Sequence, residues 1–383
     1  MTHPNASSAA TTAADAARVR FLQTPAAHLG HASTVQVVET IETHMSWVFL
    51  AGDRVLKMKK AVKYPFLDFS TLAAREHDCR EELRLNARLA PGIYLGLLAL
   101  QQRDGGYVLV PEARLPAPGV TVDWLVLMRR LPAQRLLDRL IATGGVARED
   151  IAALAGVLAD FYRRLPPAGV SPADYVARFQ REQAVNRELL LRPGFGLRDA
   201  GTALDGLDSA LQRHAPLLMA RAAGGHVVDG HGDLRPEHVC LQQPPVVIDA
   251  LEFNAALRQV DPCDELGFLG LECEMAGAPW IGPQLLASCA EALGDAPPAA
   301  LSQLYTAYRA QLRARLAVAH LLDPQPRTPH KWAPLAQRYL ERSLAALREM
   351  AATAASGQEE RAAAMPPQER DAALSAARRC GCP

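Results

Sequence analysis

The fold is decided by VVDGHGDLRPEHVC (Val227–Cys240), which is followed after a Pro-Pro turn by VVIDALEFN (Val246–Asn254). Each segment begins with a short β-prone run, and a polar loop lies between the two runs. This order places Asp233 in the loop and Asp249 directly after the second run. Phosphoryl transfer uses two such carboxylates, one to orient and deprotonate the acceptor hydroxyl and one to hold Mg²⁺ against the phosphates.

Upstream of this stretch, strand-like and helical patterns alternate. Three β-prone runs, and two or three further ones, predict an antiparallel sheet: Val35–Val38, Trp47–Leu50, Val55–Met58, Leu95–Leu100, Tyr107–Val110 and Trp124–Met128. A helix is expected from about Thr71 to Ala90, with Ser70 as its N-cap and Pro91 after its end. These elements predict a lobe of one sheet and one helix over residues 20–128.

After a short connection near Arg129–Pro132 the pattern changes to long helices. Apolar residues recur on one helical face in 151–165 and again in 301–319. A mostly helical lobe that contains the catalytic loop is therefore expected over residues 129–351.

Both ends of the chain are rich in small and polar residues. Residues 1–19 and 352–383 are expected to form flexible tails, because they offer few large apolar groups to bury. The second tail carries Cys380 and Cys382, whose spacing without further ligands does not indicate a metal site.

Composition excludes several classes of protein. The 383 residues include 41 Lys and Arg and 41 Asp and Glu, so the formal net charge is zero. Broad nucleic-acid binding requires a basic surface, and spanning a bilayer requires about 18 consecutive apolar residues. The sequence predicts neither. Its start lacks the apolar core of a secretory signal, and its seven cysteines show no pairing pattern. We therefore expect a cytoplasmic protein.

The motif His231-Gly232-Asp233-Leu234, with His238 four residues later and then Val247-Ile248-Asp249, resembles the aminoglycoside phosphotransferase family, relatives of the protein kinases. The wider pattern is similar to an uncharacterised subfamily that is often fused to a P-loop kinase domain. No G-x-x-x-x-G-K-[ST] occurs in the sequence, so we expect that domain to be absent. The resemblance covers residues 22–345. It implies an α+β, bilobal protein-kinase-like fold, with an N-lobe of antiparallel sheet plus one helix and a mostly helical C-lobe.

The resemblance also implies roles for individual residues. Asp233 is the expected catalytic residue that orients the acceptor, and Asp249 is expected to hold the metal. Lys57 is expected to hold the nucleotide phosphates. Glu82 matches the helix glutamate that pairs with this lysine. Ser46 lies where such enzymes have a serine-containing phosphate loop.

His238 stands where the wider family has asparagine. It is expected to hold the metal together with Asp249, or to hydrogen-bond Asp233 or a metal-bound water. Imidazole nitrogen suits softer cations than Mg²⁺, so Mn²⁺ is an alternative metal.

Neighbouring residues leave two alternatives open. Strand alternation places Lys59 on the same side as Lys57, so periodicity does not separate them. Glu81 is a rival to Glu82, one position away in the helix.

Other acidic residues follow the second motif. Asp264 resembles the family's structural aspartate beneath the catalytic loop. A cationic acceptor would need a pocket lined by carboxylates, for which Glu237, Glu252 and Asp261 are candidates.

Together these residues predict an ATP-dependent phosphotransferase that moves the γ-phosphoryl group to a hydroxyl of a small molecule, with Mg²⁺ as its metal. GTP is left open as the donor. The alternative is a kinase-fold nucleotide-binding or regulatory module without turnover, and nucleotidyl transfer is a third option. The acceptor is not identified, because a fold does not settle function.

Overall fold

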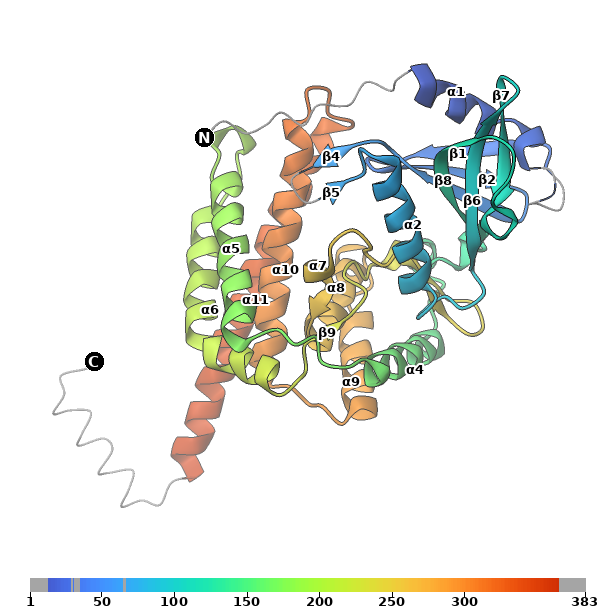
Figure 1. Ribbon diagram of the computed structural model, residues 1–383. Coiled ribbons are helices and arrows are strands. Elements are labelled where there is room, and N and C mark those ends of the chain that lie inside the picture. Colours follow the sequence, from blue (N-terminus) through green and yellow to red (C-terminus); the bar gives the residue numbers. More distant parts are fainter. Residues whose placement is uncertain (1–12, 29, 31–34, 65–66, 365–383) are drawn as a thin grey trace. The chain divides into compact units, whose positions relative to one another are not determined.

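The computed structural model describes residues 13–28, 30, 35–64 and 67–364 (Figure 1). The chain divides into two compact units, one formed by residues 1–170 and 225–295 and the other by residues 171–224 and 296–383. The sheet and the whole stretch that decides the fold belong to the first unit. The lobe boundary expected near residue 129 stays a prediction.

The first unit contains a six-stranded antiparallel sheet with the order β1-β2-β3-β8-β6-β7. Its strands are β1 (Val38–Glu42), β2 (Ser46–Ala51), β3 (Arg54–Lys59), β6 (Tyr94–Arg103), β7 (Gly106–Pro111) and β8 (Val120–Arg129). Five of the expected runs lie inside these strands. The expected strand Val35–Val38 was wrong except for its last residue. Strand β1 begins at Val38 and pairs with β2 residue by residue, from Val38 opposite Ala51 to Glu42 opposite Trp47.

Helix α2 (Leu72–Asn86) packs against β8 of this sheet (Figure 1). Its N-cap is Thr71, whose hydroxyl accepts a hydrogen bond from the Ala74 amide at 3.1 Å. The predicted cap Ser70 instead donates its hydroxyl to Asp68. The helix ends at Asn86, four residues earlier than expected. After it, the amides of Arg88 and Leu89 bond to carbonyls only three residues back, at Leu85 and Asn86.

The decisive stretch forms two small ladders. Strand β9 (Val228–Asp229) pairs with β12 (Gln259–Val260), and β10 (Val239–Cys240) pairs with β11 (Val246–Val247). The loop between β9 and β10 carries Asp233. Its apolar neighbour Leu234 is fully buried in a core shared with helices α4 (Arg148–Arg164), α8 (Pro262–Met275) and α9 (Ile281–Leu293). This burial fixes the loop, because side chains in a close-packed core hold a single arrangement.

The apolar face expected in 151–165 is confirmed. It lies on α4, where Ile151, Leu154, Leu158 and Phe161 are buried. The other elements of this unit are short: α1 (Ala13–Leu22), β4 (Lys63–Tyr64), β5 (Leu67–Asp68), α3 (Leu137–Ala142) and α7 (Ala255–Arg258).

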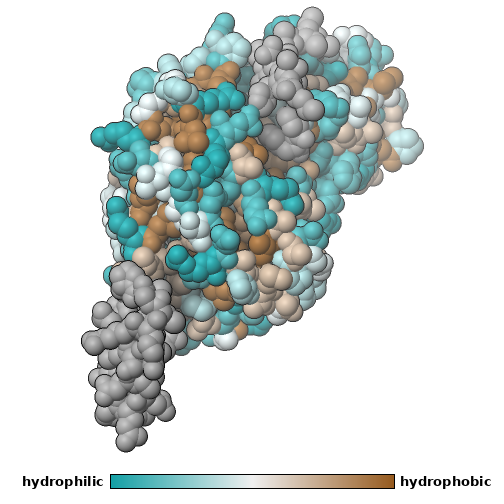
Figure 2. Space-filling model, turned by 90° about the vertical axis from the view of Figure 1, so that its left-hand side faces the viewer, coloured by the Kyte–Doolittle hydropathy of each residue, from teal (hydrophilic) through white to brown (hydrophobic). Residues whose placement is uncertain are grey.

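The second unit is helical. It consists of α5 (Pro172–Leu190), α6 (Ala200–Ala223), α10 (Ala299–Ala319) and α11 (Pro329–Ala364). The face expected in 301–319 lies on α10, where Leu301, Leu304, Tyr305 and Tyr308 are buried and Leu316 is exposed. Within the described residues, none of the helices combines the length and apolar character that crossing a bilayer requires. Hydrophilic and hydrophobic residues are interspersed on the face seen in Figure 2.

Parts of the expected tails are helical. Residues 13–19 lie in α1, where buried Val19 packs against the sheet and Arg18 pairs with Asp123 at 3.1 Å. Residues 352–364 continue α11, since their many alanines favour a helix. Residues 1–12 and 365–383, including Cys380 and Cys382, lie outside the described part of the chain.

Candidate active site

Three of the predicted site residues meet at one ammonium group. The Nζ atom of Lys57, on β3, lies 2.6 Å from Oδ1 of Asp249 and 2.9 Å from Oε1 of Glu82, on α2. Glu82 is completely buried, whereas Glu81 points away and pairs with Arg84 at 2.7 Å. The structure therefore brings Lys57 together with Glu82 and not with its rival.

These contacts fix the charge of each partner. Burial alone would lower the pKa of Lys57, but the carboxylates of Asp249 and Glu82 outweigh it and hold that pKa well above its usual range. Burial alone would raise the pKa of Asp249, but Lys57 above all, with His238, holds it well below its usual range. The pKa of Glu82 is likewise lowered by two lysines against the effect of burial. At neutral pH, Lys57, Asp249 and Glu82 are therefore all ionised.

His238 lies between the two predicted aspartates. Its Nδ1 atom is 2.8 Å from the backbone oxygen of Asp233, and its Nε2 atom is 3.6 Å from Oδ2 of Asp249. A carbonyl oxygen only accepts, so Nδ1 is the donor in this contact, and Nε2 is the ring nitrogen that faces Asp249. One third of the Asp233 side chain and 43% of the Asp249 side chain are exposed, so both carboxylates are open to solvent.

The loop that carries Asp233 is held in place by a buried carboxylate. Glu265, on α8, accepts hydrogen bonds from the amides of His231 at 3.0 Å and Gly232 at 2.6 Å. The hydroxyl of Tyr162 donates to the same carboxylate at 2.7 Å. Glu265, the residue after Asp264, thus supports the loop, and the supporting role expected of Asp264 stays a prediction. The signal for Glu265 was only its position in the first turn of a helix after the motif.

His231 supports the loop from inside. Its Nε2 atom donates to the Ile248 carbonyl at 2.9 Å, and its Nδ1 atom accepts from the Asp233 amide at 3.3 Å. Burial lowers the pKa of His231 to about 4, so the ring is neutral. A ring with both nitrogens engaged does not act as a general base.

The fold of this chain is similar to that of a solved small-molecule kinase. The choline kinase LicA of Streptococcus pneumoniae matches with a TM-score of 0.51 and 13% identity, over 87% of this chain and 99% of the kinase. This chain has the protein-kinase-like fold. An aminoglycoside phosphotransferase from Alicyclobacillus acidocaldarius matches with a TM-score of 0.46 and 13% identity, over 86% of this chain and 96% of its own.

Relatives in sequence carry no assigned activity. Uncharacterised proteins of Mycobacterium tuberculosis and Mycobacterium bovis are each 32% identical over 300 residues, or 76% of this chain. The chain spans 56% of the length of these relatives. No family model matches the chain.

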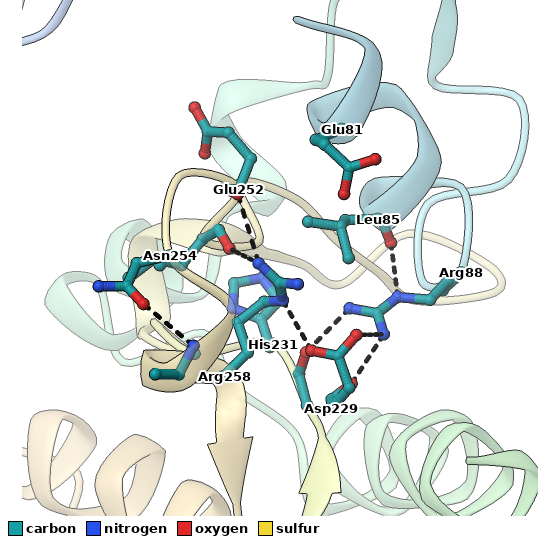
Figure 3. A network of polar contacts seen from close by, with 12 residues as sticks. Glu81, Leu85, Arg88, Asp229, His231, Glu252, Asn254 and Arg258 are labelled. Atoms are coloured by element: carbon teal, nitrogen blue, oxygen red, sulfur yellow. Dashed lines mark hydrogen bonds and ion pairs between the residues drawn. The ribbon is translucent and has the colours of Figure 1, made fainter. Parts of the chain in front are cut away.

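A second polar network surrounds Asp229, at the start of the loop that carries Asp233 (Figure 3). Arg88 and Arg258 approach Asp229 from different sides, and the Arg258 Nε atom is 2.8 Å from Oδ1 of Asp229. Arg258 also donates to the Leu251 carbonyl at 2.8 Å, and Arg88 to the Gly230 carbonyl at 2.8 Å. The two arginines thus tie the backbone before Asp233 to the backbone after Asp249 and to α2.

Ser46 is the first residue of β2 and is 3% exposed, so it begins the strand that the sequence placed after it. Its backbone amide donates a hydrogen bond to the Thr43 hydroxyl at 2.9 Å. A phosphate contact of Ser46 stays a prediction.

The three carboxylates considered for an acceptor pocket each have a local partner, and their role in such a pocket stays a prediction. Asp261 is completely buried and caps α8 by accepting from the Cys263 amide at 2.9 Å. Glu237 pairs with Arg235 at 3.1 Å, and Glu252 pairs with Lys59. These contacts give the three residues local partners within the first unit.

Asp78 lies one turn before Glu82 on α2 and is 9% exposed. Burial raises the pKa of this carboxyl to about 6; Lys59 opposes the shift and Glu252 adds to it. A folded-state pKa above the unfolded value costs stability above pH 6 and costs nothing below about pH 4. Asp78→Asn should therefore raise the free energy of unfolding by about 2 kcal/mol at pH 8. Denaturant melts at pH 8 and pH 4 would test this; an equal gain at both pH values would contradict it.

Proposed function

We propose that this chain transfers the γ-phosphoryl group of ATP to a hydroxyl group of a small molecule. The observation that carries the proposal is the position of Asp249, which lies 2.6 Å from the Lys57 ammonium and 3.6 Å from His238. His238 in turn lies 3.8 Å from the carboxylate of Asp233. Such a set supplies an ammonium for phosphates, a carboxylate for a metal and a carboxylate for the acceptor. Few other groups are needed, because this chemistry depends on positioning and charge neutralisation.

The donor set fits a divalent cation that also binds nucleotide. Asp249 offers carboxylate oxygens and His238 offers its Nε2 lone pair. Among the described residues, no group of three His, Cys, Asp or Glu side chains could hold a metal ion. A cation held here would therefore take its other ligands from water and phosphate oxygens, as Mg²⁺ does in nucleotide sites. The cation would supply charge neutralisation on the phosphates.

The remaining groups act on the reacting atoms. Lys57 would bind phosphate oxygens through the ammonium that Glu82 holds in place. Asp233 would accept the hydroxyl proton as the acceptor oxygen bonds to the γ-phosphorus and the bond from that phosphorus to ADP breaks. Arg235, whose Nε atom is 3.1 Å from Oδ1 of Asp233, would keep this carboxylate oriented.

A metabolite-pool assay tests the proposal. Purified protein is incubated with ATP, Mg²⁺ or Mn²⁺, and a small-molecule extract, and products are followed by mass spectrometry together with release of ADP. We expect one class of hydroxyl compound to gain the mass of one phosphate. Nucleotide-dependent thermal stabilisation without any product would favour the binding module, and an AMP-modified acceptor would favour nucleotidyl transfer.

Replacing His238 by asparagine is expected to shift metal preference toward Mg²⁺. Removing the imidazole nitrogen should weaken Mn²⁺ binding in the presence of ATP by about 10-fold, since softer cations gain most from nitrogen ligands. Electron paramagnetic resonance of free Mn²⁺ measures this affinity directly. Unchanged Mn²⁺ affinity would show that His238 is not a ligand.

A further inference from the structure

Lys59, two residues after Lys57 on β3, is a buried cation that the proposed chemistry does not use. Its side chain is 1% exposed, and its Nζ atom lies 2.9 Å from Oε2 of Glu82 and in contact with Glu252. The ammonium also lies 4.9 Å from the centre of the Phe69 ring. A lysine so completely removed from water persists only where its partners compensate the loss of hydration.

These contacts form a row of alternating negative and positive charges. Glu252, Lys59, Glu82, Lys57 and Asp249 follow one another, and the first and last residues are only three positions apart in one segment. Each oxygen of Glu82 lies 2.9 Å from a different lysine, and the one from Lys59 to Oε2 is a hydrogen bond. The occupied Oε2 atom therefore leaves Oε1 as the one that faces Lys57.

We propose that Lys59 is a positioning residue: it fixes the Glu82 carboxylate so that Glu82 presents Lys57 to the nucleotide, and Glu252 holds Lys59 in place. The inference rests on the proposed function and deepens it. Lys59 acts only through Glu82, because Nζ of Lys59 is enclosed by two carboxylates and a ring. It ties α2 to the segment after Asp249, so the phosphate-binding and metal-binding groups keep one mutual geometry.

A stabilising role alone and a positioning role predict different outcomes. In Lys59→Met, Glu252 keeps a buried charge without its cation, so both stability and nucleotide affinity should fall. In Lys59→Met with Glu252→Gln, that uncompensated charge is gone, and the melting temperature should return close to that of the wild type. The affinity should not return, because Oε2 of Glu82 still lacks its lysine.

The experiment measures Mg-ATP affinity by calorimetry and melting temperature for the wild type, both variants and Lys63→Met. Lys63 is the matched control, since it is an exposed lysine paired with Asp68. We expect the double variant to bind Mg-ATP about 10-fold or more weakly than the wild type. Should Lys59→Met not fold, the double variant alone decides. Wild-type affinity in the double variant would overturn the proposal.

Hydrogen exchange separates this inference from the proposed function. In the protein without nucleotide, the amides of α2 around Glu82 should exchange faster in the double variant than in Lys63→Met. If the wild type binds no Mg-ATP, the proposed function fails, but this readout still tests whether Lys59 fixes Glu82. Unchanged exchange of α2 would overturn the role of Lys59 whatever the nucleotide result.

Discussion

Asp233→Asn is expected to lower the rate of phosphoryl transfer by about 10³-fold while Mg-ATP affinity stays within about twofold of the wild type. The amide cannot accept the hydroxyl proton, but it preserves the shape of the side chain and its contact with Arg235. Asp233 does not contact Lys57, so nucleotide binding should not depend on its charge. The measurement is the single-turnover rate with the acceptor identified in the metabolite assay, beside a nucleotide titration.

Asp68→Asn is the matched control for this change. Asp68 is an exposed carboxylate paired with Lys63, and its loss should leave the rate within about twofold. A variant at Asp233 that retained wild-type turnover would remove this residue from the mechanism. Equal losses of rate and of nucleotide affinity would instead indicate a collapsed loop.

The second large effect is expected from Asp249→Asn. In the wild type, Mg²⁺ should strengthen ATP binding. In the variant this strengthening should fall by about 10- to 100-fold, because the metal would lose the Asp249 carboxylate as a ligand. ATP without metal should bind the variant at least as well, since Lys57 is no longer paired at 2.6 Å with a competing carboxylate. Calorimetric titrations with and without Mg²⁺ give both values.

This pattern separates a metal ligand from a structural residue. A structural defect would weaken ATP binding with and without metal to the same degree. If Mg²⁺ strengthened ATP binding equally in the variant and the wild type, Asp249 would not be the metal ligand.

Much of the site was predictable because local sequence fixes it. Asp233 lies between two short strands and Asp249 follows a third, and both patterns are visible in the local sequence. Alternation along β3 narrowed the lysine to Lys57 or Lys59. Glu82 could be separated from Glu81 only by structure: both lie in one helix, and tertiary packing decides which of them is buried. The same limit applies to caps, where Thr71 rather than Ser70 begins α2.

The contacts that the sequence did not reveal depend on long-range packing. Glu265 holds the loop from a helix that follows it by some thirty residues, and Glu252 reaches Lys59 across the unit. Alternation could place Lys59 beside Lys57 but could not show that both contact Glu82. No local sequence pattern predicts this row of charges, because its members come from a strand, a helix and a loop.

The most direct test is anomalous diffraction from crystals grown with Mn²⁺ and a non-hydrolysable ATP analogue. The account predicts a manganese peak bound by the Asp249 carboxylate, with the nucleotide phosphates bridging it to the Lys57 ammonium and with Asp233 facing the γ-phosphate. A nucleotide bound away from Lys57, or a manganese peak without Asp249 among its ligands, would contradict it.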